Sequence, residues 1–213
     1  MNLEIIESAV KNHALSVYGA FHPAAKDVPD GVQTLILLGP DEPRFWPYFT
    51  ASPEYKDGQP DPMDRWSLRV IGDIATTLKS YAFFPFGGPP YQPFIRWATD
   101  SGRAHVSPVG LLVHDLAGLW VSYRGALGIN ARLELPEAPP NPCLSCKGQP
   151  CRTSCPVDAL TPRGYDVAAC KTDLDRLGND CMSNGCAARR ACPVSQKHGR
   201  SAAQSAFHME AFR

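Results

Sequence analysis

All eight cysteines of this 213-residue chain fall between Cys143 and Cys192. The first group reads Cys-x2-Cys-x4-Cys-x3-Cys-Pro, a single cysteine follows at position 170, and the second group reads Cys-x4-Cys-x5-Cys-Pro. Cys155 and Cys192 each directly precede a proline, which removes a backbone donor and fixes a turn. Short loops between the cysteines allow several sulfurs to converge, so this pattern constrains the C-terminal segment more than any other feature.

The first group is close to the bacterial run C-x2-C-x2-C-x3-C-P, in which three thiolates hold one 4Fe-4S cluster and the fourth crosses to its neighbour. Backbone N–H groups in such loops can point at the sulfides and offset the negative charge of the cluster. The crossing rule predicts that one cluster is held by Cys143, Cys146, Cys151 and Cys192. It predicts that the other is held by Cys155, Cys170, Cys181 and Cys186. The longer x4 and x5 spacers leave the partition of the ligands open.

Zinc and disulfides are the rival interpretations of these cysteines. Structural zinc sites favour paired C-x2-C elements, and this chain has one such pair, at Cys143 and Cys146. A disulfide framework suits small secreted domains, but the N-terminus MNLEIIESAVKNH lacks the apolar core of a signal peptide. We therefore expect a reducing, cytoplasmic setting.

Composition argues against two classes of partner. Lysine plus arginine and aspartate plus glutamate both number 21, so the formal charge is zero and nucleic-acid binding has little support. The apolar runs are far shorter than a membrane span requires. With 44% apolar residues, the chain can build one large or two small globular cores.

A boundary is predicted near residue 136, where LPEAPPNP carries four prolines in eight residues. The cysteine-free region before it has ordinary signals of helices and strands. Leu3, Ile6 and Val10 indicate a helix, VQTLILL at 32–38 indicates a buried strand, and the four-residue period from Trp66 to Leu78 indicates a helix over 64–80. Two further strands are expected in VGLLVH and LWVSYRGALGI, within 106–129.

These motifs resemble known families. The cysteine segment, with its isolated cysteine in YDVAAC (165–170), resembles the two-cluster ferredoxin domain of epoxyqueuosine reductase and reductive dehalogenases. The preceding region resembles the domain before the clusters in those enzymes, and also the CblC-type cobalamin-processing protein. DPMD (61–64), HDLAGLW (114–120), Arg124-Gly125 and Ile129 carry that likeness.

The resemblance implies an α+β fold with two domains. Residues 1–135 would form a nitroreductase-like or CblC-like domain, and residues 136–213 a small bacterial-ferredoxin-like domain with two 4Fe-4S clusters. In the related enzymes the first domain cradles a corrinoid such as cobalamin, and the clusters deliver electrons to cobalt. Two departures argue against epoxyqueuosine reduction. The segment FPFGGPP (84–90) lacks the acid found there in that enzyme, and no helical-repeat region follows Cys192.

Four residues are candidates for contact with a bound cofactor. Gly87 and Gly88 would let a flat macrocycle approach the backbone, although a tight loop explains them equally well. Trp120 and Arg124 would share one face of a strand and form a wall for an anionic cofactor, the alternative being a core tryptophan and a surface arginine. His114 is expected to cap a turn with Asp115 rather than bind metal. Phe207, His208 and Met209 are expected in a terminal helix over a cluster.

Three classes of function stay open, and no catalytic residue is identified. The chain can be an iron-sulfur oxidoreductase that reduces a cofactor, corrinoid or small-molecule substrate held by residues 1–135. It can be a plain carrier whose N-terminal domain docks a redox partner protein. It can also be a corrinoid-binding chaperone without turnover. Fold analogy does not choose among them.

Overall fold

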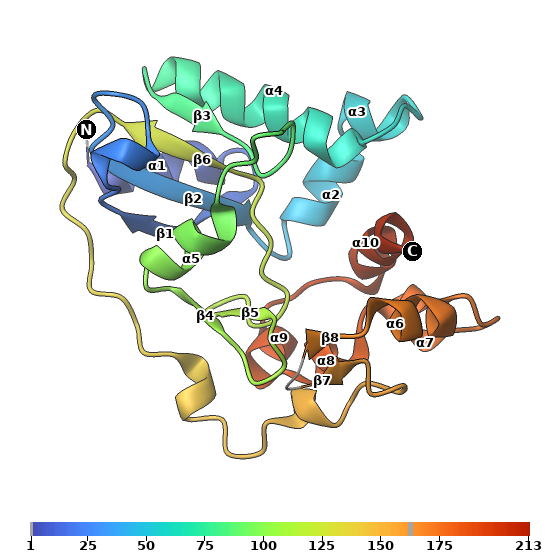
Figure 1. The fold of residues 1–213 in the computed structure, drawn as a ribbon. Helices are drawn as coiled ribbons and strands as arrows, with labels where there is room; N and C mark the ends of the chain where they lie inside the picture. The colour runs from blue at the N-terminus through green and yellow to red at the C-terminus, as the bar shows by residue number, and fades with distance from the viewer. Residues whose placement is uncertain (1, 162–163) are drawn as a thin grey trace. The chain divides into compact units, whose positions relative to one another are not determined.

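The computed structural model describes residues 2–161 and 164–213. It is a mixed α/β protein that divides into two compact units, drawn together in Figure 1. The first unit contains residues 1–103 and 122–138, and the second contains residues 104–121 and 139–213.

The first unit is built on a four-stranded sheet in the order β1-β2-β6-β3, with antiparallel neighbours throughout. The strands are β1 (Leu15–Phe21), β2 (Thr34–Pro40), β3 (Tyr81–Phe83) and β6 (Gly125–Ile129). Strand β2 lies between two partners and is buried at every position, which confirms the buried strand predicted there. Such a strand reads as a continuous apolar run because both of its faces are covered.

Five helices complete this unit: α1 (Leu3–Lys11), α2 (Phe45–Thr50), α3 (Pro53–Lys56), α4 (Pro62–Thr77) and α5 (Phe94–Asp100). A short 3-10 turn covers Ala25–Asp27. The periods that predicted helices in α1 and α4 are confirmed, since Ile6, Val10, Trp66, Val70 and Ile74 are all buried. Helix α4 packs against β3 and β6.

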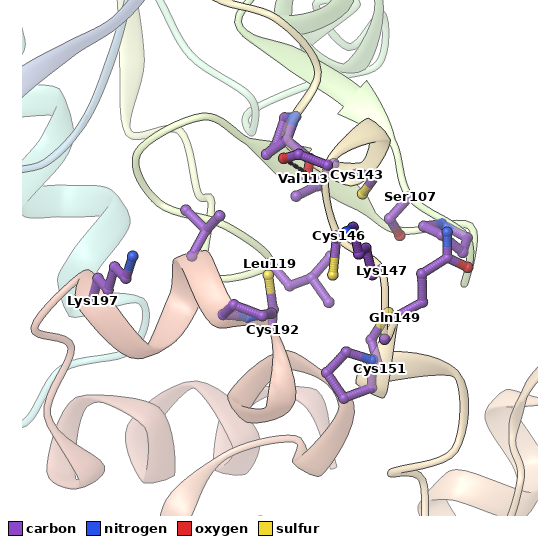
Figure 2. A pocket seen from close by; sticks show the side chains of 17 residues that line it. Ser107, Val113, Leu119, Cys143, Cys146, Lys147, Gln149, Cys151, Cys192 and Lys197 are labelled. Carbon is purple, nitrogen blue, oxygen red and sulfur yellow. Dashed lines mark hydrogen bonds between the residues drawn. The ribbon is translucent and has the colours of Figure 1, made fainter.

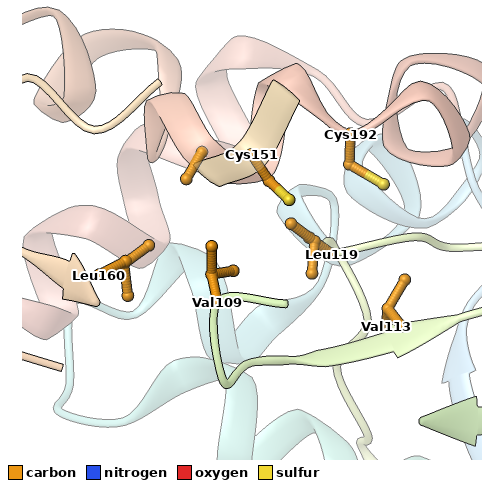
Figure 3. Packing of buried hydrophobic residues seen from close by; sticks show 7 residues of the cluster. Val109, Val113, Leu119, Cys151, Leu160 and Cys192 are labelled. Atoms are coloured by element: carbon orange, nitrogen blue, oxygen red, sulfur yellow. The ribbon is translucent and has the colours of Figure 1, made fainter. Parts of the chain in front are cut away.

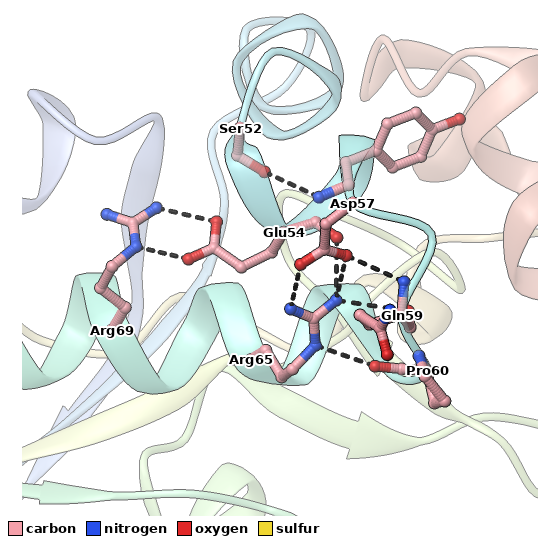
Figure 4. A network of polar contacts seen from close by, with 8 residues as sticks. Ser52, Glu54, Asp57, Gln59, Pro60, Arg65 and Arg69 are labelled. Atoms are coloured by element: carbon pink, nitrogen blue, oxygen red, sulfur yellow. Dashed lines mark hydrogen bonds and ion pairs between the residues drawn. The ribbon is translucent and has the colours of Figure 1, made fainter.

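Ion pairs fix the junction between α3 and α4, as Figure 4 shows. Arg69 donates from Nε and Nη2 to the two carboxylate oxygens of Glu54, at 2.5 and 2.9 Å. Arg65 pairs with Asp57 at 2.7 and 2.8 Å and also donates to the carbonyl of Pro60 at 2.9 Å. Charge-assisted bidentate contacts of this kind orient two short elements against each other.

The second unit consists of short elements. It has two hairpins, β4 (Ala104–Val106) with β5 (Leu112–His114) and β7 (Leu160–Thr161) with β8 (Gly164–Tyr165), and 3-10 turns at Pro142–Leu144 and Pro150–Arg152. Its helices are α6 (Val167–Leu174), α7 (Asp180–Asn184), α8 (Ala187–Ala191), α9 (Pro193–Lys197) and α10 (Ala202–Phe212). The expected terminal helix is therefore present as α10, which packs against α7.

The division of the chain differs in one respect from the expected boundary between 135 and 136. The stretch 104–121, from the middle of the expected first domain, belongs to the second unit. Its apolar side chains Val109, Val113 and Leu119 form a buried cluster with Cys151, Leu160, Ala188 and Cys192 (Figure 3). The cysteine loops contain few apolar residues of their own. Residues 104–121, which contain β4 and β5 and are called the inserted hairpin below, therefore supply much of the core around them.

The strands expected within 106–129 are also shorter than predicted. Beyond the end of β4 at Val106, the strands of this range are Leu112–His114 and Gly125–Ile129, and residues 120–124 adopt neither helix nor strand. Trp120 falls in the second unit and Arg124 in the first, so the two residues do not share a strand face. Among the residues that the structure describes, no helix combines the length and apolar character needed to cross a bilayer.

Candidate metal centre

Side-chain caps position the loops that carry the cysteines. Asn141 Oδ1 accepts a hydrogen bond from the backbone N–H of Cys143 at 2.9 Å, at the start of the first 3-10 turn. Asp166 caps α6, which carries Cys170, and Asn179 caps α7, which carries Cys181. Caps of this kind satisfy the free N–H groups at helix starts and stabilise very short helices.

Prolines set the backbone where two of the cysteines lie. Pro193 is the first residue of α9 and directly follows Cys192, while Pro150 opens the 3-10 turn that holds Cys151. Proline suits a first helical position because its missing N–H would have no partner there. The sequence predicted fixed turns at the Cys192-Pro193 pair and in the short spacers. The structure has a helix start at Pro193 and a 3-10 turn at Pro150.

One set of four cysteines borders a single cavity of the second unit. The cavity has a volume of about 570 Å³, and Figure 2 shows the side chains around it. Its sulfur-bearing residues are Cys143, Cys146, Cys151 and Cys192. Cys143, Cys146 and Cys151 lie within one short stretch, whereas Cys192 is distant in sequence and lies between α8 and α9. They are the same four that the cysteine spacing assigns to one cluster.

Apolar residues of the inserted hairpin, and Val194 from α9, also line this cavity. Ser107, Pro108, Val113 and Leu119 line it together with Val194. Val113 and Leu119 are buried, with about 1% of each residue exposed. An apolar wall of this kind limits the access of water to a bound group and lowers the local dielectric constant, both of which influence a redox centre.

The thiols of this set affect one another. Burial raises the pKa of Cys143, and the nearby Cys151, Cys192 and Cys146 raise it further. Burial also raises the pKa of Cys151, followed by the effect of Cys192 and Cys146. The raised pKa values of Cys143 and Cys151 mean that these two thiols resist ionisation, since a thiolate here is poorly solvated and repels neighbouring negative charge. A bound cation reverses this preference and takes the sulfurs as thiolates.

The other four cysteines also lie close enough for their charges to influence the pKa values of their neighbours. Burial raises the pKa of Cys170, and Cys186 and Cys155 add to this effect. The pKa of Cys181 is likewise raised by burial, with a contribution from Cys186. Cys155, Cys170, Cys181 and Cys186 are thus linked to one another through Cys170 and Cys186, and their binding of one cluster stays a prediction.

Hydrogen-bond donors point at the sulfurs of the second set. The backbone N–H of Ala159 donates to Cys155 Sγ at 3.3 Å. The Tyr165 hydroxyl bonds to the Cys170 sulfur and acts to lower the pKa of that thiol. A backbone bond from Ala187 acts in the same direction on Cys181. Such donors stabilise negative charge on sulfur and tune the potential of an iron-sulfur cluster.

A single metal ion and a multi-iron cluster place different demands on these cysteines. None of the eight cysteines is in a disulfide. Across residues 2–161 and 164–213, no three His, Cys, Asp or Glu side chains converge in the way a single metal ion would need. A zinc ion draws its sulfur ligands to about 2.3 Å from one point. A 4Fe-4S cluster places an iron between each sulfur and the centre, so its ligands border a space, as the first set does.

His114 has a structural role in the hairpin. The residue is fully buried, and its Nδ1 accepts hydrogen bonds from the backbone N–H groups of Leu116 at 3.1 Å and Ala117 at 3.3 Å. Its Nε2 lies 3.3 Å from Asp115 Oδ1. The prediction that His114 caps a turn with Asp115 is confirmed.

The four residues expected around a corrinoid are divided between the units. Gly87 and Gly88 lie in the loop after β3, where Gly87 has φ of +80° and a side chain on Gly88 would come within 2.8 Å of the Tyr91 ring. The loop itself therefore requires both glycines. In the second unit, the guanidinium of Arg200 lies 4.9 Å from the ring centroid of Trp120.

Arg124 is neither the surface residue nor the strand residue considered from the sequence. Its side chain is 13% exposed, and Nη1 lies 3.6 Å from Asp64 Oδ1 in the first unit. Burial lowers the pKa of Arg124, and Asp64 partly offsets this. Burial also raises the pKa of Asp64, whereas Arg124 acts to lower it. The arginine is a largely buried cation held near a half-exposed acid.

Several residues around the cysteines were not singled out from the sequence. Leu119 and Ser107 border the cavity from a hairpin distant in sequence, and Lys147 and Lys197 lie at its edge. Arg189 is partly buried near Cys186 and donates to the Leu119 carbonyl at 2.7 Å. The sequence could have indicated the two lysines, because each lies within five residues of a cysteine. It gives no indication that the hairpin lies beside the cysteines.

No protein-family model, curated protein or solved structure matches this chain. The arrangement of the cysteines is therefore the main basis for assigning a function.

Proposed function

We propose that this protein is an iron-sulfur electron-transfer protein whose second unit holds two 4Fe-4S clusters. One observation supports the proposal above all others. Cys143, Cys146, Cys151 and Cys192 border one cavity, although Cys192 is distant in sequence from the other three, and the cysteine spacing groups the same four. The mutual electrostatic effects within the remaining four cysteines add to this support.

Each cluster, when bound, supplies a site that accepts and releases one electron at a time. The residues of the chain provide its surroundings. Val113 and Leu119 exclude water from the first cavity, and their apolar surface favours a state of low net charge. The Ala159 N–H and the Tyr165 hydroxyl place positive dipoles on sulfurs of the second set. The two sets thus have different surroundings, which favours different reduction potentials.

We assign the electron acceptor to the first unit, as a cofactor or small-molecule substrate, with a corrinoid as one candidate. Two features support this assignment. The unit has its own sheet and core and is far larger than electron carriage alone requires. It also keeps Arg124 buried, and its Nε has no hydrogen-bond partner among the described residues. A buried guanidinium with an open donor is suited to an anionic group.

Anaerobic reconstitution with iron and sulfide tests the proposal. The purified chain should take up about eight iron and eight sulfide, as two 4Fe-4S clusters require. Reduction followed by electron paramagnetic resonance should show two centres, each accepting one electron. Protein made under iron-replete, oxygen-free conditions that contains tightly bound zinc and no iron would refute the assignment.

A further inference from the structure

Segments of different charge surround the first cysteine set and three of the four cysteines of the second; Cys155 of the second set lies in the same segment as Cys143, Cys146 and Cys151. The segments that carry the first set, 139–157 and 187–201, contain no aspartate or glutamate. Their basic residues are Lys147, Arg152, Arg189, Arg190, Lys197 and Arg200. The segment 164–186, which carries Cys170, Cys181 and Cys186, instead contains four aspartates against one lysine and one arginine. The segments around the first set are thus basic in a chain whose overall charge is zero, although Arg189 interacts with Cys186 and Arg190 pairs with Asp180.

Two exposed cations line the first cavity, and an exposed leucine lies close to one of them in sequence. Lys147 and Lys197 both line the cavity, and both side chains are exposed to solvent (Figure 2). Leu144, between Cys143 and Cys146, is 84% exposed. An apolar centre with a charged edge is the usual composition of a protein-protein contact site. Here that site would lie directly over the cysteines.

We propose that the cavity of Cys143, Cys146, Cys151 and Cys192 marks the electron-entry face, where a small acidic one-electron carrier protein docks against Lys147, Lys197 and Leu144. This inference rests on the proposed function, because it assumes a cluster in that cavity. In the step itself, one electron leaves the reduced carrier and reduces this cluster by one electron. No bond is formed or broken. The reductant is the carrier, which leaves oxidised.

Exposed lysines suit docking better than tuning of the cluster. Solvent and salt screen an exposed charge, so it influences a buried redox centre weakly, while it still steers an approaching partner. A partly buried cation, in contrast, lies near the second set. Arg189 is partly buried, interacts with Cys186, and is held by the Leu119 carbonyl. Tuning by a fixed positive charge is thus a role for Arg189, and partner attraction is a role for Lys147 and Lys197.

The test is stopped-flow reduction of the reconstituted protein by a reduced, acidic plant-type ferredoxin. The variant Lys147→Gln/Lys197→Gln removes two charges from the docking face. The charge control, Lys171→Gln/Arg176→Gln, removes two charges from the same unit beside the second set, where each cation also has a hydrogen-bond partner. At low salt we expect the first variant to lower the second-order rate constant about tenfold, as loss of steering charges does. The control should change it little, and the difference should vanish at high salt.

Two accompanying measurements separate this inference from the proposed function. Iron and sulfide contents establish that every variant holds both clusters, and absence of clusters in the parent protein would defeat the proposed function itself. A redox titration shows whether the variant shifts a cluster potential. Full clusters with an unchanged rate constant, a larger effect in the control, or a slower rate explained by a shifted potential would each overturn the docking proposal.

Discussion

The backbone N–H of Leu119 donates a hydrogen bond to Ser195 Oγ at 2.8 Å. This bond joins the inserted hairpin to α9, the helix that follows Cys192. The approach is close because residue 118 is glycine. A Cβ there would lie 2.4 Å from the Ser195 nitrogen, and its φ of +57° also disfavours other residues. One wall of the cysteine cavity is therefore held at a distance that only glycine allows.

The substitution Gly118→Ala should separate the hairpin from α9 and loosen the first cluster. We expect a loss of about 1–3 kcal/mol from steric overlap in addition to the cost of the positive φ. Gly110→Ala is the matched control, because its φ is +76° and no atom lies within 4 Å of the added Cβ. Iron release to a chelator should be faster in Gly118→Ala than in Gly110→Ala. Equal rates would show that the contact does not support the cavity.

Removal of the clusters should loosen the second unit selectively, including the hairpin. Residues 104–121 pack their apolar side chains against Cys151 and Cys192, so their order depends on the loops that the clusters hold. Hydrogen exchange on the apo protein should show lost protection in 104–121 and 139–213. Strands β1, β2 and β6 serve as the internal control and should remain protected. A hairpin as protected in the apo form as in the holo form would contradict this dependence.

The pair of Glu54 and Arg69 makes stability depend on pH. The hydrogen bonds from Arg69 hold the pKa of Glu54 below its usual value, so the folded state binds this proton less readily than the unfolded chain. The stabilisation is therefore fully present above the unfolded pKa of about 4.3 and is lost as the pH falls through the lower folded value. Arg69→Gln should cost about 1 kcal/mol at pH 7.

Urea denaturation of both proteins at pH 7 and at acid pH measures this effect. The free-energy difference between wild type and Arg69→Gln should shrink as Glu54 becomes protonated. Arg44→Gln, which breaks the more exposed pair with Asp41, is the matched control and should cost less. A difference that stays constant down to acid pH would show that Arg69 acts through packing of its stem rather than through its charge.

Local patterns predicted the elements of the first unit well, because α1, α4 and β2 each bury a face that their own sequence specifies. The same reasoning failed for 104–124. Nothing local in VGLLVHDLAGLW shows that its apolar residues pack beside cysteines that follow much later in the chain. Trp120 and Arg124 look like strand neighbours, but the chain changes unit between them. Long-range packing decided both outcomes.

The grouping of the cysteines came from spacing rather than from periodicity. The crossing rule grouped Cys192 with Cys143, Cys146 and Cys151 across a wide gap in sequence, and the cavity contains the same four residues. Metal occupancy of both sets stays a prediction. The partner of Arg124, Asp64, was not predicted from the sequence, because the DPMD segment indicated only a helix start. Its pairing with Arg124 depends on the packing of α4 against the sheet.

Loss of one cysteine from each set tests the central claim most directly. Cys146→Ala and Cys186→Ala are reconstituted anaerobically beside the parent chain, and iron, sulfide and resonance signals are compared. The account predicts that each variant loses about half of the iron, and that the signal lost in one is the signal kept in the other. Loss of all iron from either single variant, or loss of the same signal from both, would contradict two clusters held by separate sets.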